Sequence, residues 1–302
     1  MNPTLRSFIV LNVVIGIGAL VAWAGSQNSL GFNDISLFWW CGLLAFAIQW
    51  LAFVPAYLKQ TEHFYDLTGS ITYVSVVAVA MWLGGKTDPR SVIVALLVCI
   101  WAVRLGSFLF LRIRQDGSDS RFDKIKPNPM RFLVAWTLQG LWVLFTLAAA
   151  LVVMTSEQVK PLGVIGFVGI ALWLVGFVIE VVSDHQKRVF REARSRGEAG
   201  PFITTGLWAH SRHPNYFGEI VLWTGIAIVA VPLMQGGQWI GLISPVFVAL
   251  LLIRVSGIPM LEKKSDQQWG DDPAYQAYKA RTPVLVPKLF VKNAGVEAAN
   301  SQ

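Results

Sequence analysis

A polar segment, GLWAHSRHPNYFGE at residues 206–219, stands directly before an apolar stretch of the chain. Its polar residues include Arg212, His213, Asn215, Tyr216 and Glu219. Backbone amides at the start of a helix, with an arginine and a histidine beside them, form an anion site suited to the phosphates of a nucleotide. The segment therefore predicts a nucleotide-binding loop.

His210 and His213 lie three residues apart and could instead begin a metal site. No cluster of cysteine, histidine or carboxylate residues with helical ligand spacing completes such a site in the sequence. We therefore expect no bound metal.

A second set of charged residues recurs at the spacing of one helix face, near the end of the sixth apolar run. Its members are Glu180, Asp184, Lys187 or Arg188, and Arg191. A helix that leaves a membrane with acidic groups near the interface and basic groups beyond it could hold a phosphorylated ligand. A solvated helix face whose charges pair with one another gives the same pattern.

A third set lies in the segment WGDDPAYQAYKARTPVLVP at residues 269–287, which contains Tyr275, Tyr278, Lys279 and Arg281. Aromatic rings can stack on a base and cations can hold phosphate, so the segment suits a nucleotide. An interfacial amphipathic helix with aromatic anchors explains it equally well.

The elements that position these residues follow from the composition. The 302 residues are 54 % hydrophobic and only 14 % charged, with a mean hydropathy of +0.53. Soluble domains carry about 25 % charged residues, which excludes an ordinary soluble protein. Cys41 and Cys99 both lie inside apolar runs, where they indicate neither a disulfide framework nor a thiolate metal site.

A membrane-spanning helix needs about 20 mainly apolar residues. By this criterion the chain has about eight candidate spans, at residues 8–25, 37–57, 66–84, 91–111, 132–154, 162–183, 217–235 and 238–258. The first run could be a signal peptide, but it is long for one, and we favour an uncleaved span. The sequence predicts an all-α polytopic bundle of seven or eight spans.

Basic residues orient the spans, because positively charged loops stay in the cytoplasm. Most of the 25 Lys and Arg residues fall in the loops and tail on one side, whereas Lys86, Arg90 and Lys160 fall on the other. We therefore expect both termini in the cytoplasm. The basic loops also suit anionic lipid, and their division among membrane loops argues against nucleic acid.

Charged residues inside spans cost free energy and are candidates for function. Asp66 opens the third span, Arg104 lies inside the fourth and Arg254 lies late in the eighth. Asp66 could also simply favour the start of its helix, and Arg104 could extend its side chain to water. We expect Arg104 to hold a ligand or an ion pair.

The sequence lacks the motifs that mark soluble nucleotide-binding folds and serine hydrolases. There is no GxGxxG after a strand, no GxxxxGK[ST] and no GxSxG. A nucleotide must therefore bind between membrane helices.

The motifs together resemble a known family. WAVRLGSFLFLRIRQDGSDSRF (101–122), Gln139-Gly140, SDHQKRVFR (183–191), GLWAHSRHPNYFGE and AYQAYKARTPVLVP occur in the order seen in the DUF1295 branch of the steroid 5-alpha-reductase superfamily. The resemblance covers roughly residues 60–290, and RHPNYFGE is its most specific motif. The C-terminal half is also similar to isoprenylcysteine carboxyl methyltransferases.

The resemblance implies a membrane-embedded reductase that uses NADPH to reduce a carbon-carbon double bond conjugated to a carbonyl. It places cofactor contacts at Arg112, Arg114, Asp184, Arg191, Asn215, Glu219, Arg254 and the stretch from Tyr278 to Arg281. Asp66 precedes Arg104 by a separation close to that between the family's catalytic carboxylate and a basic residue. Asp66 is therefore our candidate for that carboxylate.

At the position of the proton donor this chain departs from the family pattern. The steroid enzymes have a tyrosine about three residues before that basic position, where this chain has Trp101. Tyr65, adjacent to Asp66, or Tyr73, seven residues on along the same helix face, could take its place. In this hypothesis a protonated Asp66, hydrogen-bonded by Tyr65, polarises the substrate carbonyl. Glu180, where the steroid enzymes have an asparagine, suggests a lipid-like substrate other than a steroid hormone.

Two alternatives stay open. One is a methyltransferase of lipid-like substrates that uses S-adenosylmethionine, and the other is a non-enzymatic transporter or lipid-binding protein. The cations Arg191, Arg212 and Arg281 favour NADPH, because S-adenosylmethionine carries no phosphates. We expect N-terminal spans at 1–60, a reductase-like domain at 61–290 and a disordered tail at 291–302, in a monomer of a bacterial inner membrane.

Overall fold

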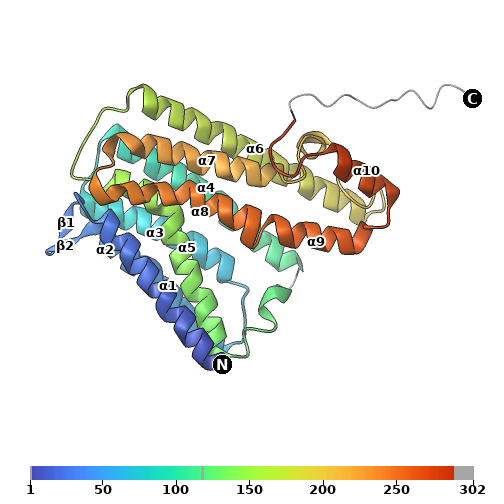
Figure 1. Cartoon of the computed structure of the whole chain (residues 1–302), viewed down its shortest axis with the longest axis horizontal. Helices are drawn as coiled ribbons and strands as arrows, with labels where there is room; N and C mark the ends of the chain where they lie inside the picture. Colours follow the sequence, from blue (N-terminus) through green and yellow to red (C-terminus); the bar gives the residue numbers. More distant parts are fainter. Residues whose placement is uncertain (1, 117–118, 289–302) are drawn as a thin grey trace, which may run out of the picture. The chain divides into compact units, whose positions relative to one another are not determined.

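The computed structural model describes residues 2–116 and 119–288. Within these residues the chain is mostly helical, with one short strand hairpin, as predicted for an all-α protein (Figure 1). The α-helices are α1 Pro3–Gly25, α2 Leu37–Leu58, α3 Tyr65–Gly84, α4 Pro89–Asp116, α5 Pro129–Thr155, α6 Gly163–Ser195, α7 Pro214–Ala230, α8 Ile243–Leu250, α9 Ile258–Trp269 and α10 Pro273–Arg281. The strands β1 Gly31–Phe32 and β2 Ile35–Ser36 form one short hairpin.

Eight helical segments in the described part of the chain are long and apolar enough to cross a membrane. They correspond to the eight runs predicted from the sequence, so the prediction of a polytopic helical membrane protein is confirmed. The largest difference lies in α6, whose 33 residues form one helix. At about 1.5 Å per residue this helix is longer than a bilayer core of about 30 Å, so its C-terminal turns extend past the hydrocarbon region.

The helices form two compact units. Unit 1 comprises residues 1–171 and 224–247, and unit 2 comprises residues 172–223 and 248–302. The two units do not follow the domain boundaries predicted at residues 60 and 290. Those boundaries describe where the family's motifs lie in the chain, and they stay predictions. Of the predicted tail at 291–302, nothing lies within the described residues.

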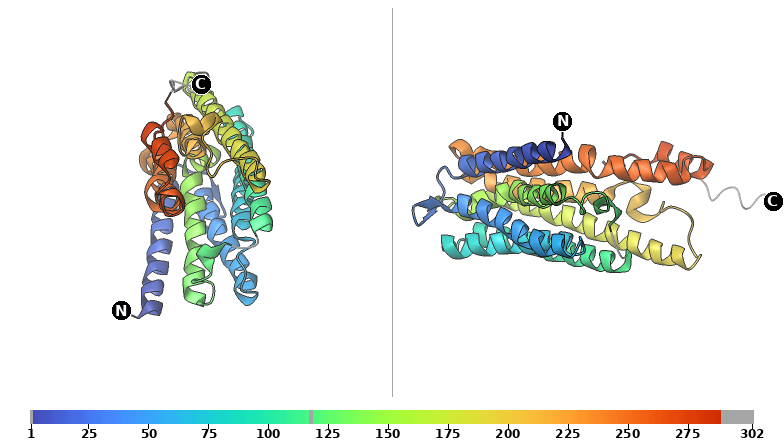
Figure 2. Two further views of the ribbon diagram at one scale, coloured as in Figure 1. Left: turned by 90° about the vertical axis from the view of Figure 1, so that its right-hand side faces the viewer. Right: turned by 90° about the horizontal axis from the view of Figure 1, so that it is seen from below.

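Helix α5 is the centre of unit 1. It contacts α1, α2, α3 and α4. Within its most apolar 18-residue stretch, 89 % is buried inside the protein. Both views in Figure 2 place α5 between α1 on one side and α3 and α4 on the other. Its start is fixed by Asn128, whose side chain accepts a hydrogen bond from the Arg131 amide at 3.0 Å, and by Pro129 at the first helical position.

Unit 1 also contains a buried arginine. Arg90 is 1 % exposed, and its guanidinium donates to the carbonyl oxygens of Leu162 at 2.9 Å, of Lys160 and Pro161, and of Val229. These bonds tie α4 to the loop before α6 and to the end of α7. Arg90 is one of the few basic residues predicted on the non-cytoplasmic side, and these bonds give it a structural role.

The last span is interrupted in unit 2. A π-helical turn, Leu251–Val255, connects α8 to α9, and Gly257 lies at the junction. A Cβ atom at Gly257 would lie 2.4 Å from the carbonyl oxygen of Leu252, so only glycine fits there without a shift. The interruption lets the chain continue as α9, which carries Glu262 and Asp266.

Candidate functional site

In unit 2, the closest approach of α6 and α7 positions the first site residues. A Cβ atom at Gly218 would lie 2.6 Å from the carbonyl oxygen of Gly176, so the two backbones are in contact there. One turn before Gly218, the amide of Asn215 donates a hydrogen bond to the carboxylate of Asp184 at 3.1 Å. The two helices thus bring together two residues that the sequence placed in separate motifs.

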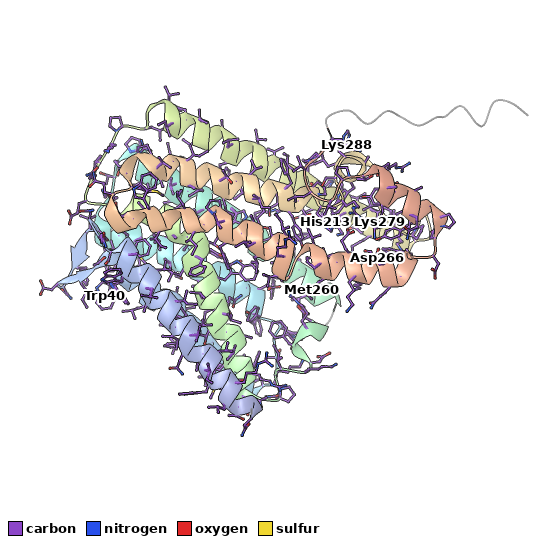
Figure 3. All side chains as sticks on the ribbon, in the orientation of Figure 1. Trp40, His213, Met260, Asp266, Lys279 and Lys288 are labelled. Atoms are coloured by element: carbon purple, nitrogen blue, oxygen red, sulfur yellow. The ribbon has the colours of Figure 1, made fainter. Side chains whose placement is uncertain are left out.

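Arg212 and His213 share one carboxylate, which sequence reasoning missed. Glu262 of α9 accepts from Arg212 Nη1 at 2.6 Å and contacts His213 Nε2 at 2.8 Å. The His213 ring also lies parallel to the Tyr216 ring, with centroids 5.6 Å apart and planes at 10°. No signal in the sequence joined Glu262 to residues about 50 positions earlier. Figure 3 labels His213 together with Asp266 of α9 and Lys279 of α10.

The C-terminal segment closes over the same loop. The carbonyl of Pro283 accepts from the Arg212 amide at 2.9 Å, and that of Leu285 accepts from the Ser211 hydroxyl at 2.7 Å. The Lys288 amide then donates to His210 at 3.1 Å. This extended segment, residues 283–288, therefore holds the residues that precede α7.

Tyr278 makes a hydrogen bond and a ring contact within the protein. Its hydroxyl donates to the carbonyl of Trp208 at 2.8 Å, and its ring lies 5.9 Å from that of Phe202. Burial raises the pKa of Tyr278 above its ordinary value. The neighbouring Tyr275 donates to Asp266 at 3.1 Å, and burial and this bond raise its pKa to about 12. The rings of Tyr275 and Tyr278 on α10 thus pack with Phe202, and stacking of this segment on a base stays a prediction.

Some polar atoms in this loop cluster are buried and lack a hydrogen-bond partner among the described residues. They are Arg212 Nε, His213 Nδ1 and Thr282 Oγ1. Leaving such an atom unpaired costs about 1–3 kcal/mol, and native structures contain few of them. A donor and two possible acceptors concentrated in one loop cluster suit a polar ligand.

The other predicted cofactor residues of unit 2 lie at its surface or partly buried. Arg191, Arg254 and Arg281 are exposed, and Glu219 is half-buried on the second turn of α7. Among the described residues, no group of three or more His, Cys, Asp or Glu could hold a metal ion.

In unit 1 the predicted catalytic residues lie along α3. The Tyr73 ring packs edge-to-face on the Trp101 ring, with centroids 5.1 Å apart, and both side chains are buried. Tyr65 differs from expectation, because its hydroxyl donates to the carbonyl of Ala135 at 2.9 Å. A phenol has one proton to donate, so Tyr65 does not give it to Asp66 here.

Of the three basic residues predicted to contact the cofactor from α4, the structure describes the side chain of one. Arg104 is half-buried, with its guanidinium 5.6 Å from the centroid of the Phe108 ring. The side chains of Arg112 and Arg114 lie outside the described residues. The roles proposed for them stay predictions from the family resemblance.

A further cation near Asp66 was not predicted. Arg121 pairs with Asp119 and interacts electrostatically with Asp66 and Tyr65. Its hydrogen bonds to Asp119 raise the pKa of Arg121, and Asp66 adds to this. The adjacent Phe122 packs against the Tyr65 ring with centroids 4.8 Å apart. The segment that carries Arg121 therefore lies against the start of α3.

The eight apolar helices among the described residues indicate a multi-pass membrane protein, and comparison with known proteins adds its family. Residues 52–282 match the family model described as "Protein of unknown function (DUF1295)". The chain therefore belongs to the DUF1295 family, as its motifs predicted.

Two of the relatives carry the name of a steroid enzyme. The chain is 34 % identical over 120 residues to 3-oxo-5-alpha-steroid 4-dehydrogenase 1 of Rattus norvegicus, a match that covers 39 % of this chain and 40 % of the rat protein. It is 46 % identical over 63 residues to the Mus musculus protein of that name, covering 20 % of this chain and 24 % of the mouse protein. The chain thus spans less than half the length of these relatives.

A longer match has no assigned activity. An uncharacterized protein of Schizosaccharomyces pombe is 21 % identical over 231 residues, covering 66 % of this chain and 64 % of the yeast protein. No solved structure matches the chain significantly.

Proposed function

We propose that the protein is a membrane-embedded, NADPH-dependent reductase of a carbon-carbon double bond conjugated to a carbonyl, in a steroid-like or other lipid-like substrate. One observation in the structure carries the proposal. Arg212 and His213 before α7 and Asn215 in its first turn lie close to Glu262 and Asp184, while buried polar atoms of this cluster lack partners among the described residues. The names of the rat and mouse relatives support the reaction class.

The residues of unit 2 suit a phosphorylated dinucleotide. Arg212 Nε is a buried donor with no partner in the described part of the chain, and Arg191, Arg254 and Arg281 add exposed positive charge. Arginine holds phosphate by charge-assisted hydrogen bonds. The polar residues that would hold and orient the dinucleotide are Asp184, His213, Asn215, Tyr216, Glu219 and Tyr278. The resemblance adds Arg104, Arg112 and Arg114 to this proposal.

The chemistry divides into three tasks. The bound cofactor supplies the hydride, and the protein must polarise the carbonyl oxygen and deliver a proton to the adjacent carbon. We assign the first of these protein tasks to Asp66 in its protonated form and the second to Tyr73. The assignment to Tyr73 is supported by its contact with Trp101 and by the engagement of Tyr65 with Ala135.

Turnover tests the proposal. Purified protein in detergent is incubated with NADPH deuterated at the transferable position and with a panel of ketones, each supplied as the conjugated enone and as its saturated counterpart. We expect one deuterium in the reduced product of at least one enone and none in the saturated counterparts. NADPH consumption without labelled product, equal in Asp66→Asn and wild type, would contradict the proposed reaction.

A further inference from the structure

Glu262 links two residues that the sequence placed in the cofactor site. One carboxylate oxygen accepts from Arg212 Nη1 at 2.6 Å, and the other contacts His213 Nε2 at 2.8 Å. An arginine can only donate hydrogen bonds, and a carboxylate can only accept them. The proton of the His213 ring must therefore lie on Nε2 when the ring is neutral.

His213 is buried, with 6 % of its side chain exposed. Burial lowers the pKa of His213, and Lys187 and Arg212 act in the same direction, whereas Glu262 opposes them. The net shift is downward, so the ring is neutral at neutral pH. Its second nitrogen, Nδ1, then carries a lone pair and can only accept.

Nδ1 is one of the buried atoms of this cluster that lack a partner among the described residues. The ring cannot readily turn to satisfy it, because one face lies parallel to Tyr216 and Nε2 is held by Glu262. The buried Nδ1 is therefore a fixed acceptor that calls for a donor from a bound molecule.

We propose that Glu262 is a positioning residue that fixes His213 as a hydrogen-bond acceptor for an amino group of the bound dinucleotide. This inference rests on the proposed function. NADPH offers two such groups, the carboxamide of the nicotinamide and the exocyclic amine of the adenine, and in this proposal one of them donates to His213 Nδ1.

Cofactor analogues test which group is read. The 3-acetylpyridine analogue of NADPH replaces the carboxamide amino group with a methyl group, and the hypoxanthine analogue replaces the adenine amine with a carbonyl oxygen. In the wild-type protein we expect one analogue to bind roughly tenfold more weakly than NADPH, because it leaves Nδ1 unpaired. The other analogue should bind as NADPH does.

Glu262→Gln provides the decisive variant. Arg212 can only donate, so the new amide turns its oxygen to Arg212 and its NH₂ group to His213. His213 Nε2 must then accept, which moves the ring proton to Nδ1 and makes that atom a donor. In the wild-type protein, NADPH should bind roughly tenfold more tightly than the analogue that lacks the recognised amino group. In Glu262→Gln we expect this preference for NADPH to disappear or to reverse. A merely structural role would weaken both ligands equally.

Asp266→Asn is the matched control, since Asp266 lies one turn further along α9 and pairs with Lys279 and Tyr275. It should keep the wild-type ratio, and thermal unfolding of both variants reports whether they fold. The inference is overturned if the wild-type protein binds both analogues as tightly as NADPH, or if Glu262→Gln keeps the wild-type ratio. Absence of NADPH binding to the wild-type protein would instead overturn the proposed function.

Discussion

The ring of Tyr73 packs edge-to-face on the indole of Trp101, with centroids 5.1 Å apart and planes at 89°. The family resemblance predicts that Trp101 occupies the position of a tyrosine in the steroid enzymes, and an indole N–H is too weak an acid to replace that phenol. The phenol of Tyr73 therefore belongs to the immediate surroundings of that position. The contact supports Tyr73, rather than Tyr65, as the proton donor.

Tyr73→Phe should reduce turnover by a factor of about 10² to 10⁴ without weakening NADPH binding, because it removes the proposed proton donor and keeps the ring contact with Trp101. Tyr65→Phe removes a hydroxyl from the same helix and should instead cost about 1 kcal/mol of stability through the lost bond to Ala135. Steady-state rates and thermal unfolding separate the two effects. The assignment fails if Tyr65→Phe loses more turnover than Tyr73→Phe.

Asp66→Asn should abolish turnover while NADPH still binds, because an amide N–H is a much weaker acid than a carboxyl O–H and polarises the substrate carbonyl far less. Arg191→Ala should weaken NADPH binding first, because it removes positive charge from the proposed phosphate site. Equilibrium titration and turnover assays on both variants test this division. Equal loss of cofactor affinity in the two variants would contradict it.

Glu62 provides a test of stability against pH. Its carboxylate is buried and accepts from Lys126 at 2.7 Å and from the Asp119 amide at 3.0 Å. Burial acts to raise the pKa of Glu62, but these hydrogen bonds outweigh it and the pKa lies below its ordinary value of 4.5. The stabilisation is therefore present above pH 4.5 and is lost as the pH falls below it.

Thermal unfolding of the whole detergent-solubilised protein between about pH 2.5 and pH 7 measures this effect, because the loss falls below the ordinary carboxyl pKa. The wild-type protein should lose stability towards the acidic end, and Glu62→Gln should be less stable at pH 7 with a flatter profile. If both proteins show the same slope, Glu62 does not hold the segment that carries Asp119 and Lys126.

The contact of α6 with α7 gives a prediction for Gly218. Gly218→Ala should cost about 1–3 kcal/mol and weaken NADPH binding, because the new Cβ would lie 2.6 Å from Gly176 O and separate Asn215 from Asp184. Gly16→Ala is the control, since nothing lies within 4 Å of a Cβ atom there. Equal effects of the two substitutions on NADPH affinity would refute the positional role of Gly218.

The spans could be predicted from the sequence because hydrophobic length is a local property of the chain. The register of Glu180, Asp184 and Arg191 on one helix is local for the same reason, and α6 is indeed continuous through all three. Continuation of the last span as α9 was not predicted, because a π-helical turn at Leu251–Val255 has no strong sequence signal.

The pairing partners could not be predicted. Glu262 meets Arg212 and His213 across about 50 residues, and the Tyr65 hydroxyl meets the Ala135 carbonyl across 70. Periodicity says which face of a helix a residue occupies, but not which distant group lies opposite. The sequence therefore indicated candidate cofactor ligands, whereas the structure showed which of them already share a protein partner.

The proposed use of NADPH is tested by a side-by-side equilibrium titration of the detergent-solubilised protein with NADPH, NADP and S-adenosylmethionine. We predict tight binding of NADPH that Arg191→Ala weakens, with no comparable binding of S-adenosylmethionine. Binding of S-adenosylmethionine in place of NADPH would contradict the account, assign the protein to methyl transfer and leave Asp66 without its proposed role.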